Sequence, residues 1–183
     1  MPTRPSPLVT RLLASAIGAL AVLSVLGLAR SALGTTVRIT AVPAAAVGYA
    51  PAAEASWLKV PYKPLVEGTE CVDDVNSRHY NLVVERGGVR DVDWKSSERM
   101  RAVEGYRWGV VVAHNADPPV AGRGSCIFLH IWAGPDKGTA GCTAMAQPNL
   151  EELLRWLDAR RRPVLVQLPE GEYARLRGAW RLP

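Results

Sequence analysis

The sequence predicts a mainly β domain with a few helices. Short runs rich in Val, Ile, Tyr and Trp recur between Gly- and Pro-containing segments, which is typical of strands joined by turns. Only two stretches show the apolar spacing of a longer helix. The hydrophobic content of 48%, with six Trp among 183 residues, is sufficient for a core. These observations place a domain at residues 57–183, and no internal repeat is visible.

The first 34 residues have the features of an export segment. Arg4 and Arg11 precede an uncharged apolar run at residues 12–29. The run is longer than a usual signal-peptide core and just long enough to cross a bilayer, and small residues at 32–34 suit a signal peptidase. A cleaved signal peptide and an uncleaved membrane anchor through residues 12–29 both remain open, and a buried core helix is the third reading. Either export reading places the rest of the chain outside the cytoplasm.

Residues 35–56 are predicted to be a linker. They are rich in Ala, Val and Thr, contain two prolines and show no helical period. The folded domain is therefore expected to start near Trp57.

The formal charge of +5 comes largely from the N-terminal segment. Arg4, Arg11 and Arg30 lie there without any acidic residue, whereas the whole chain has 22 basic and 17 acidic residues. The charge that remains is small and evenly spread, which argues against a nucleic-acid partner.

Within the domain, β-rich runs and turn residues define the expected elements. Strands are expected at residues 57–60, 80–84, 108–113, 126–132 and 164–168. Ser96 or Ser97 could cap a short helix over residues 96–102. In the strand at 126–132, alternation puts Cys126, Phe128 and His130 on one face.

Two further helices are expected near the C-terminus. In residues 148–158 Pro148 suits the first helical position, and leucines at 150, 153, 154 and 157 form one apolar face. The second helix is expected over residues 172–180.

Cys142 and His130 are the candidate catalytic pair. A cysteine needs a base to act as a nucleophile near neutral pH, and a histidine is the usual one. Gly141 allows close approach of a substrate and offers an N–H to a developing oxyanion. The alternative is a buried structural cysteine and a core histidine. The second ring nitrogen of His130 needs an orienting acceptor, for which Asp136 or a loop carbonyl would serve.

Other polar residues allow more than one reading. His79, His114, His130 and a cysteine could bind a metal, but no pair has the close spacing of a zinc motif. Three cysteines cannot all pair within one chain, so Cys71 and Cys126 form either a disulfide or two buried thiols. Asp73 and Asp74 form either a solvated turn or a site for a cationic substrate group. Tyr80 and Asn81 are either structural or line a cleft.

The stretch from Gly124 to Met145 resembles the L,D-transpeptidase catalytic domain family, known as the YkuD/ErfK-like family. The similarity is closest to a subgroup with a short loop between histidine and cysteine and a T-A-G-C motif, here Thr139 to Cys142. Supporting matches extend upstream to residues 71–74 and 80–81 and downstream to Leu168.

The resemblance implies a β-sandwich of mixed sheets with a helix after the catalytic cysteine. It also implies an exported enzyme of the periplasm or cell envelope that acts on peptidoglycan stem peptides in cell-wall biogenesis and cell shape. Cys142 would form a thioester acyl-enzyme with His130 as the base. Gly141, Thr139, Tyr80 and Asn81 would contribute the oxyanion hole and substrate binding.

Two residues depart from the common family motif. Ala140 replaces a histidine and Ala144 replaces an Arg or Asn. The candidate nucleophile and base are still present, but the Arg or Asn side chain that helps to bind the acyl donor in the family is missing. A carboxypeptidase that uses water as the acceptor, and a non-catalytic peptidoglycan-binding domain, therefore remain open beside the transpeptidase. The chain is expected to be a monomer without cofactor or metal.

Overall fold

The computed structural model describes residues 8–14, 23–25, 38–41 and 45–183. The strands are β1 (Leu8–Ala14), β2 (Leu23–Val25), β3 (Arg38–Ala41), β4 (Ala46–Gly48), β5 (Tyr62–Pro64), β6 (Thr69–Val72), β7 (Val83–Glu85), β8 (Ser97–Arg99), β9 (Gly109–Val111), β10 (Phe128–Ile131), β11 (Thr143–Met145) and β12 (Pro163–Pro169). The α-helices are α1 (Gln147–Trp156) and α2 (Glu170–Leu176), and short 3-10 helices are η1 (Ala52–Ala55), η2 (Arg86–Gly88), η3 (Met100–Ala102), η4 (Glu104–Arg107) and η5 (Ala159–Arg161). The predicted class, mainly β with a few helices, is confirmed.

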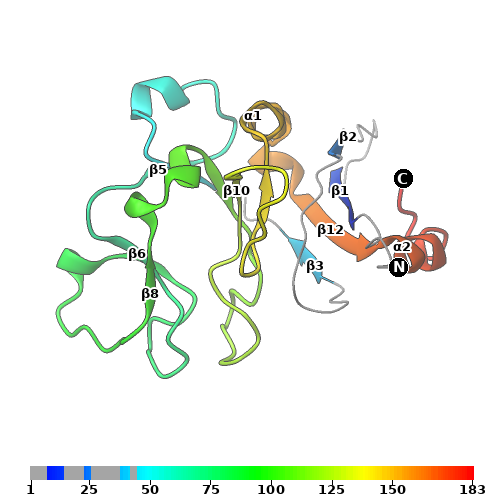
Figure 1. The fold of residues 1–183 in the computed structure, drawn as a ribbon. Helices are drawn as coiled ribbons and strands as arrows, with labels where there is room; N and C mark the ends of the chain where they lie inside the picture. The colour runs from blue at the N-terminus through cyan, green and yellow to red at the C-terminus, as the bar shows by residue number, and fades with distance from the viewer. Residues whose placement is uncertain (1–7, 15–22, 26–37, 42–44) are drawn as a thin grey trace.

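A mixed five-stranded sheet forms the centre of the domain, in the order β11-β10-β9-β4-β5. β10 pairs in parallel with β11 and antiparallel with β9, while β4 pairs in parallel with β5. Figure 1 shows this sheet between α1 and the strands β6 and β8. The edge strand β11, which pairs in parallel with β10, begins at the residue after Cys142, the candidate nucleophile.

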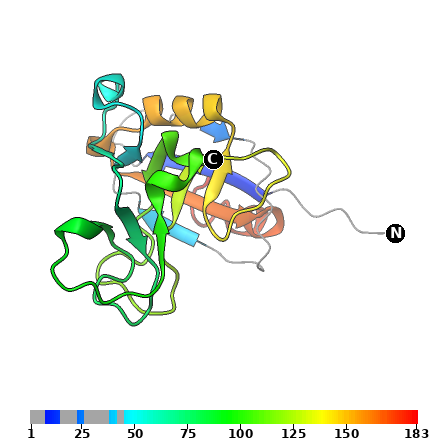
Figure 2. The ribbon, with the colours of Figure 1, turned by 60° about the vertical axis from the view of Figure 1, so that its left-hand side comes forward.

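A second, antiparallel sheet has the order β2-β1-β12-β3. Figure 2 shows β12 beside β1 in this sheet. Leu165 of β12 is buried in the same cluster as Val110 and Leu129 of the central sheet. The amide of Gln167 also donates to the hydroxyl of Thr143 at 2.5 Å. The two sheets therefore share one core, as in a β-sandwich.

Helix α1 forms where the leucine spacing predicts it and starts five residues after Cys142. Pro148 lies in its first turn, where its missing N–H costs no hydrogen bond. Leu150, Leu153 and Leu154 are fully buried against the central sheet. Burial of each leucine contributes roughly 2 kcal/mol. The helix thus closes the face of β10 opposite His130.

A third sheet, β7-β6-β8, has three strands and contains Cys71 and Glu98, which lie near the site. Cys71 of β6 pairs with Glu98 of β8. The helix expected at 96–102 is wrong: residues 97–99 form a strand, and only the 3-10 turn η3 follows. Pairing with β6 outweighs the local helical preference, as tertiary context commonly does.

The predicted linker is wrong for residues 45–56. β4 lies between β9 and β5, and Ala46 and Val47 are fully buried. Small apolar residues can form a short internal strand without any visible period. The strand expected at 57–60 is also absent, because only Lys59 forms an isolated bridge, to Asp158. The other expected strands form with shifted ends, and α2 ends at Leu176 instead of residue 180.

The apolar run at residues 12–29 lies mostly outside the described residues. Its described parts belong to β1 and β2, so the export segment stays a prediction. None of the helices in the described part of the chain has the length and hydropathy needed to cross a bilayer.

Candidate active site

The parallel pairing of β10 with β11 brings the candidate catalytic residues together. In this register Leu129 faces Thr143 and His130 faces Ala144. Successive side chains of a strand alternate between faces, so Phe128 and His130 share the face opposite Leu129. Cys142 directly precedes β11, and the backbone N–H of Phe128 donates to its sulfur at 3.4 Å. Residues twelve positions apart in sequence thus lie on neighbouring strands at one edge of the sheet.

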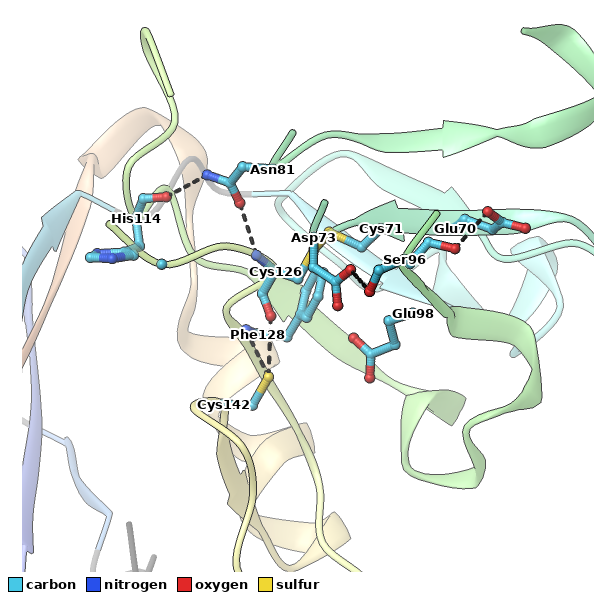
Figure 3. Close-up of a disulfide and its surroundings, with 12 residues drawn as sticks. Glu70, Cys71, Asp73, Asn81, Ser96, Glu98, His114, Cys126, Phe128 and Cys142 are labelled. Carbon is cyan, nitrogen blue, oxygen red and sulfur yellow. Dashed lines mark hydrogen bonds between the residues drawn. A yellow bond between two sulfur atoms is a disulfide. The ribbon is translucent and has the colours of Figure 1, made fainter. Parts of the chain in front are cut away.

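The thiol of Cys142 is held by backbone groups on both sides. Besides accepting from Phe128, it donates to the carbonyl oxygen of Cys126 at 3.4 Å. Cys126 itself forms a disulfide with Cys71, which is one of the two alternatives that the sequence leaves open. Figure 3 shows Cys142 next to Cys126 and Phe128, with Asp73 and Glu98 beside the disulfide. The disulfide therefore consumes two of the three cysteines and leaves Cys142 as the thiol at the site.

His130 is held in the tautomer that a general base requires. Its Nδ1 lies 2.7 Å from the carbonyl oxygen of Ile131, an interaction that assigns the proton to Nδ1 and leaves the lone pair on Nε2. Burial lowers the pKa of His130, and the hydrogen bond to Ile131 only partly opposes this. The neutral ring is therefore the favoured form. A backbone carbonyl takes the orienting role, and Asp136 does not.

Two residues of η4 confine the His130 ring. The ring of Tyr106 packs edge-on against it, with centroids 5.1 Å apart. On Gly105 a Cβ would come within 3.0 Å of Nδ1 of His130 and would overlap the carbonyl oxygen of Ile131. Only glycine lets the η4 backbone approach the histidine and its acceptor this closely.

A cavity of about 470 Å³ joins the two candidate residues. Its wall consists of two short loop segments, two acidic side chains and the candidate pair Cys142 and His130. These residues are Asp73, Glu98, Ser125, Cys126, Ile127, His130, Gly138, Thr139, Ala140, Gly141 and Cys142. Gly141 and Thr139, two of the expected site residues, lie in this wall, and their roles in the oxyanion hole and in substrate binding stay predictions. The hydroxyl of Thr139 donates to the carbonyl oxygen of Cys142 at 2.5 Å and so shapes the turn before β11.

Tyr80 and Asn81 do not line this cavity. Tyr80 is buried, and Asn81 adopts a left-handed backbone conformation with φ of 63°. The Asn81 amide donates to the carbonyls of His114 and Asn115 at 2.8 and 2.7 Å, and its oxygen accepts from the N–H of Cys126 at 2.8 Å. The expected substrate-binding role is corrected: Asn81 satisfies backbone groups and fixes the loop that carries Cys126.

Sequence reasoning missed Glu98 and Tyr106. The Tyr106 hydroxyl donates to the Glu98 carboxylate at 3.0 and 3.1 Å. Burial raises the pKa of Glu98, the Tyr106 hydrogen bond lowers it and the charge of Asp73 raises it further, with a net upward shift. Burial raises the pKa of Tyr106, and interactions with Cys142 and Glu98 raise it further, so this phenol stays protonated. Predicting a strand instead of a helix at residues 97–99 would have allowed Glu98 to be placed opposite Cys71.

The three histidines each contact a different group. Nδ1 of His79 lies 3.2 Å from Asp93, and Nε2 of His114 lies 2.8 Å from the carbonyl oxygen of Arg123. Among the described residues no group of three or more His, Cys, Asp or Glu side chains is arranged to hold a metal ion. The arrangement supports nucleophilic chemistry by a thiol and an imidazole.

Comparison with protein families gives a match over most of the chain. The sequence profile of the L,D-transpeptidase catalytic domain, YkuD, matches residues 34–166, which is more than half of the chain. The match also covers the whole of the segment that the sequence predicts to be a linker, residues 35–56. No curated protein and no solved structure gives a significant match.

Proposed function

Because the chain belongs to the YkuD family of L,D-transpeptidase catalytic domains, we propose that it is a cysteine acyltransferase of peptidoglycan stem peptides. The observation that carries the proposal is that Cys142 and His130 line one cavity, with the histidine in the tautomer that leaves Nε2 unprotonated. Family membership supports a substrate in the cell wall and a location in the cell envelope, outside the cytoplasm.

The first half-reaction forms a thioester. Nε2 of His130 takes the thiol proton as the Cys142 sulfur bonds to the carbonyl carbon of the third residue of a stem peptide, at the peptide bond to the fourth residue. Backbone N–H groups at Gly141 and Cys142 stabilise the oxyanion. The intermediate collapses when the bond to the fourth residue, D-alanine, breaks, and His130 returns the proton to the leaving amine.

The second half-reaction releases the acyl group to an acceptor. An amine from a second stem gives a cross-link, and water gives a trimmed stem. In both cases His130 takes a proton from the acceptor and then restores the thiol of Cys142. Transfer to an amine and hydrolysis both start from the same acyl-enzyme, so both depend on the residues of the first half-reaction.

The direct test incubates the purified chain with tetrapeptide stems and measures D-alanine release. Cys142→Ala and His130→Ala are expected to lower the rate by several orders of magnitude while the chain stays folded. His79→Ala is a matched control, since this ring pairs with Asp93 outside the cavity. Equal D-alanine release by wild type and Cys142→Ala would refute the proposal.

Labelling distinguishes an enzyme from a non-catalytic binding domain. Iodoacetamide should modify Cys142 faster in wild type than in His130→Ala, because the histidine promotes the thiolate. An equal rate in both proteins would favour the binding domain.

A further inference from the structure

Glu98 occupies a defined position in the cavity of Cys142 and His130. It lies on β8, opposite Cys71 of the disulfide. Both carboxylate oxygens accept from the hydroxyl of Tyr106, at 3.0 and 3.1 Å. Because only 1% of Tyr106 is exposed, the phenol is a fixed support. The carboxylate is thus held in place beside the nucleophile, although no step of the first half-reaction uses it.

The charge of the cavity is unbalanced. Glu98 and Asp73 both line it, and none of the described residues that line it is a lysine or arginine. The hydrogen-bond donors of these carboxylates are hydroxyl groups, from Tyr106 to Glu98 and from Ser96 to Asp73. A cationic group entering the cavity would therefore meet two carboxylates that neutral donors hold in place. This favours an ammonium group over a neutral or anionic one.

The chemistry of an amine acceptor requires a second proton acceptor. At neutral pH an alkyl amine is an ammonium ion and has no lone pair with which to attack a thioester. It must lose one proton before the attack and another when the C–N bond forms. His130 can take one of these protons. Water needs only one proton acceptor, so hydrolysis leaves no role for a second.

We propose that Glu98 binds the ammonium group of the acyl acceptor and takes its first proton, which makes it a specificity-determining residue for an amine over water. The inference rests on the proposed function. Glu98 carboxylate and R–NH3+ give the carboxylic acid and R–NH2. The amine nitrogen then bonds to the thioester carbonyl carbon and the C–S bond breaks. The second nitrogen proton passes through His130 to the Cys142 sulfur, and Glu98 releases its proton to solvent.

The surroundings of Glu98 suit this role. Partial burial and the charge of Asp73 make the carboxylate a stronger base than a solvated one, and a general base works best when its pKa lies near the working pH. The Tyr106 hydroxyl offers a single donor, so oxygen lone pairs remain for an ammonium group. Tyr106 positions Glu98 and also interacts with the side chain of Cys142.

The test compares two acceptors for the same acyl-enzyme. The full chain is incubated with a tetrapeptide stem and with either methylamine, an ammonium ion at neutral pH, or hydroxylamine, which is neutral there. Amide, hydroxamate and hydrolysis products are quantified together. Glu98→Gln should lower transfer to methylamine about 100-fold more than transfer to hydroxylamine. Glu98→Asp should recover part of the difference, and Glu67→Gln, an exposed acid outside the cavity, should behave as wild type.

The outcomes separate the inference from the proposed function. No D-alanine release by wild type, with either acceptor or none, refutes the proposed function. Release with hydrolysis alone, or equal losses for both acceptors in Glu98→Gln, overturns the role of Glu98 and leaves the acyl-enzyme intact. If Glu98→Gln does not fold, Glu98→Asp provides the same comparison, and an unchanged acceptor ratio in that variant also overturns the inference.

Discussion

The thiol of Cys142 donates a hydrogen bond to the carbonyl oxygen of Cys126, with 3.4 Å between sulfur and oxygen. Cys126 is also one half of the disulfide to Cys71 on β6. The candidate nucleophile therefore touches backbone that is covalently tied to the three-stranded sheet, where Glu98 lies. This contact links the stability of the fold to the geometry of the site.

Loss of the disulfide should lower stability. The bond spans 55 residues of sequence, and the chain-entropy model assigns such a loop about 4 kcal/mol. The Cys71→Ser/Cys126→Ser double variant should lose about this much free energy of unfolding in urea titrations. Dithiothreitol should destabilise wild type similarly and leave the double variant unaffected. Cys142→Ser, which keeps the disulfide, should respond to reductant as wild type does; if it does not, the pairing is wrong.

Replacement of Asn81 should loosen the loop that carries Cys126. Asn81→Ala leaves the N–H of Cys126 and the carbonyls of His114 and Asn115 without their amide partner. The expected cost is about 1–3 kcal/mol, because partly buried backbone groups lose hydrogen bonds. Asn81→Asp keeps the acceptor for Cys126 and should cost less. Thermal unfolding measures both variants, and equal stability of Asn81→Ala and wild type would contradict the structural role.

A methyl group on Gly105 should displace the base. In Gly105→Ala the new Cβ would crowd Nδ1 of His130 and overlap the carbonyl oxygen of Ile131. A small misplacement of a catalytic group can cost about 100-fold in rate, so we expect a loss of that order in kcat with a smaller change in KM. Gly87→Ala is the matched control, since nothing lies within 4 Å of a Cβ there. Similar kinetics for the two variants would show that Gly105 does not position His130.

The pH dependence of the reaction should reflect the buried His130. Burial lowers its pKa, so the ring stays neutral at pH values where a solvated histidine is already protonated. The acid limb of kcat/KM should therefore lie below the ordinary histidine pKa, and activity should fall as the pH drops through the lowered value. Tyr106, whose ring packs against His130, stays protonated across this range.

An NMR titration of the His130 imidazole provides an independent measurement of its pKa. The His79→Ala variant, which removes a ring paired with Asp93, should leave the limb in place. An acid limb at or above the ordinary histidine pKa would contradict the assignment of His130 as the buried base.

The residues of the local motifs could be predicted because their signals are local. The spacing of Leu150, Leu153 and Leu154 predicts α1, since a helix repeats every 3.6 residues. Alternation predicts that Phe128 and His130 share a face of β10. The cysteine and histidine types, their spacing and the T-A-G-C motif were sufficient to select Cys142 and His130. The predicted start of β10 is wrong: Cys126 has a φ of 55° and lies outside the strand, which begins at Phe128.

The sequence by itself determined the candidate pair Cys142 and His130, the helix that follows it and the mainly β class, because each depends on residues near one another along the chain. The tertiary structure alone decided that β4 is internal, that Glu98 reaches the cavity from β8 and that Tyr106 holds it. It also decided that a backbone carbonyl, of Ile131, orients His130. These features arise from pairing between distant strands, and such pairing depends on the burial and hydrogen bonding of the whole fold, which no local period records.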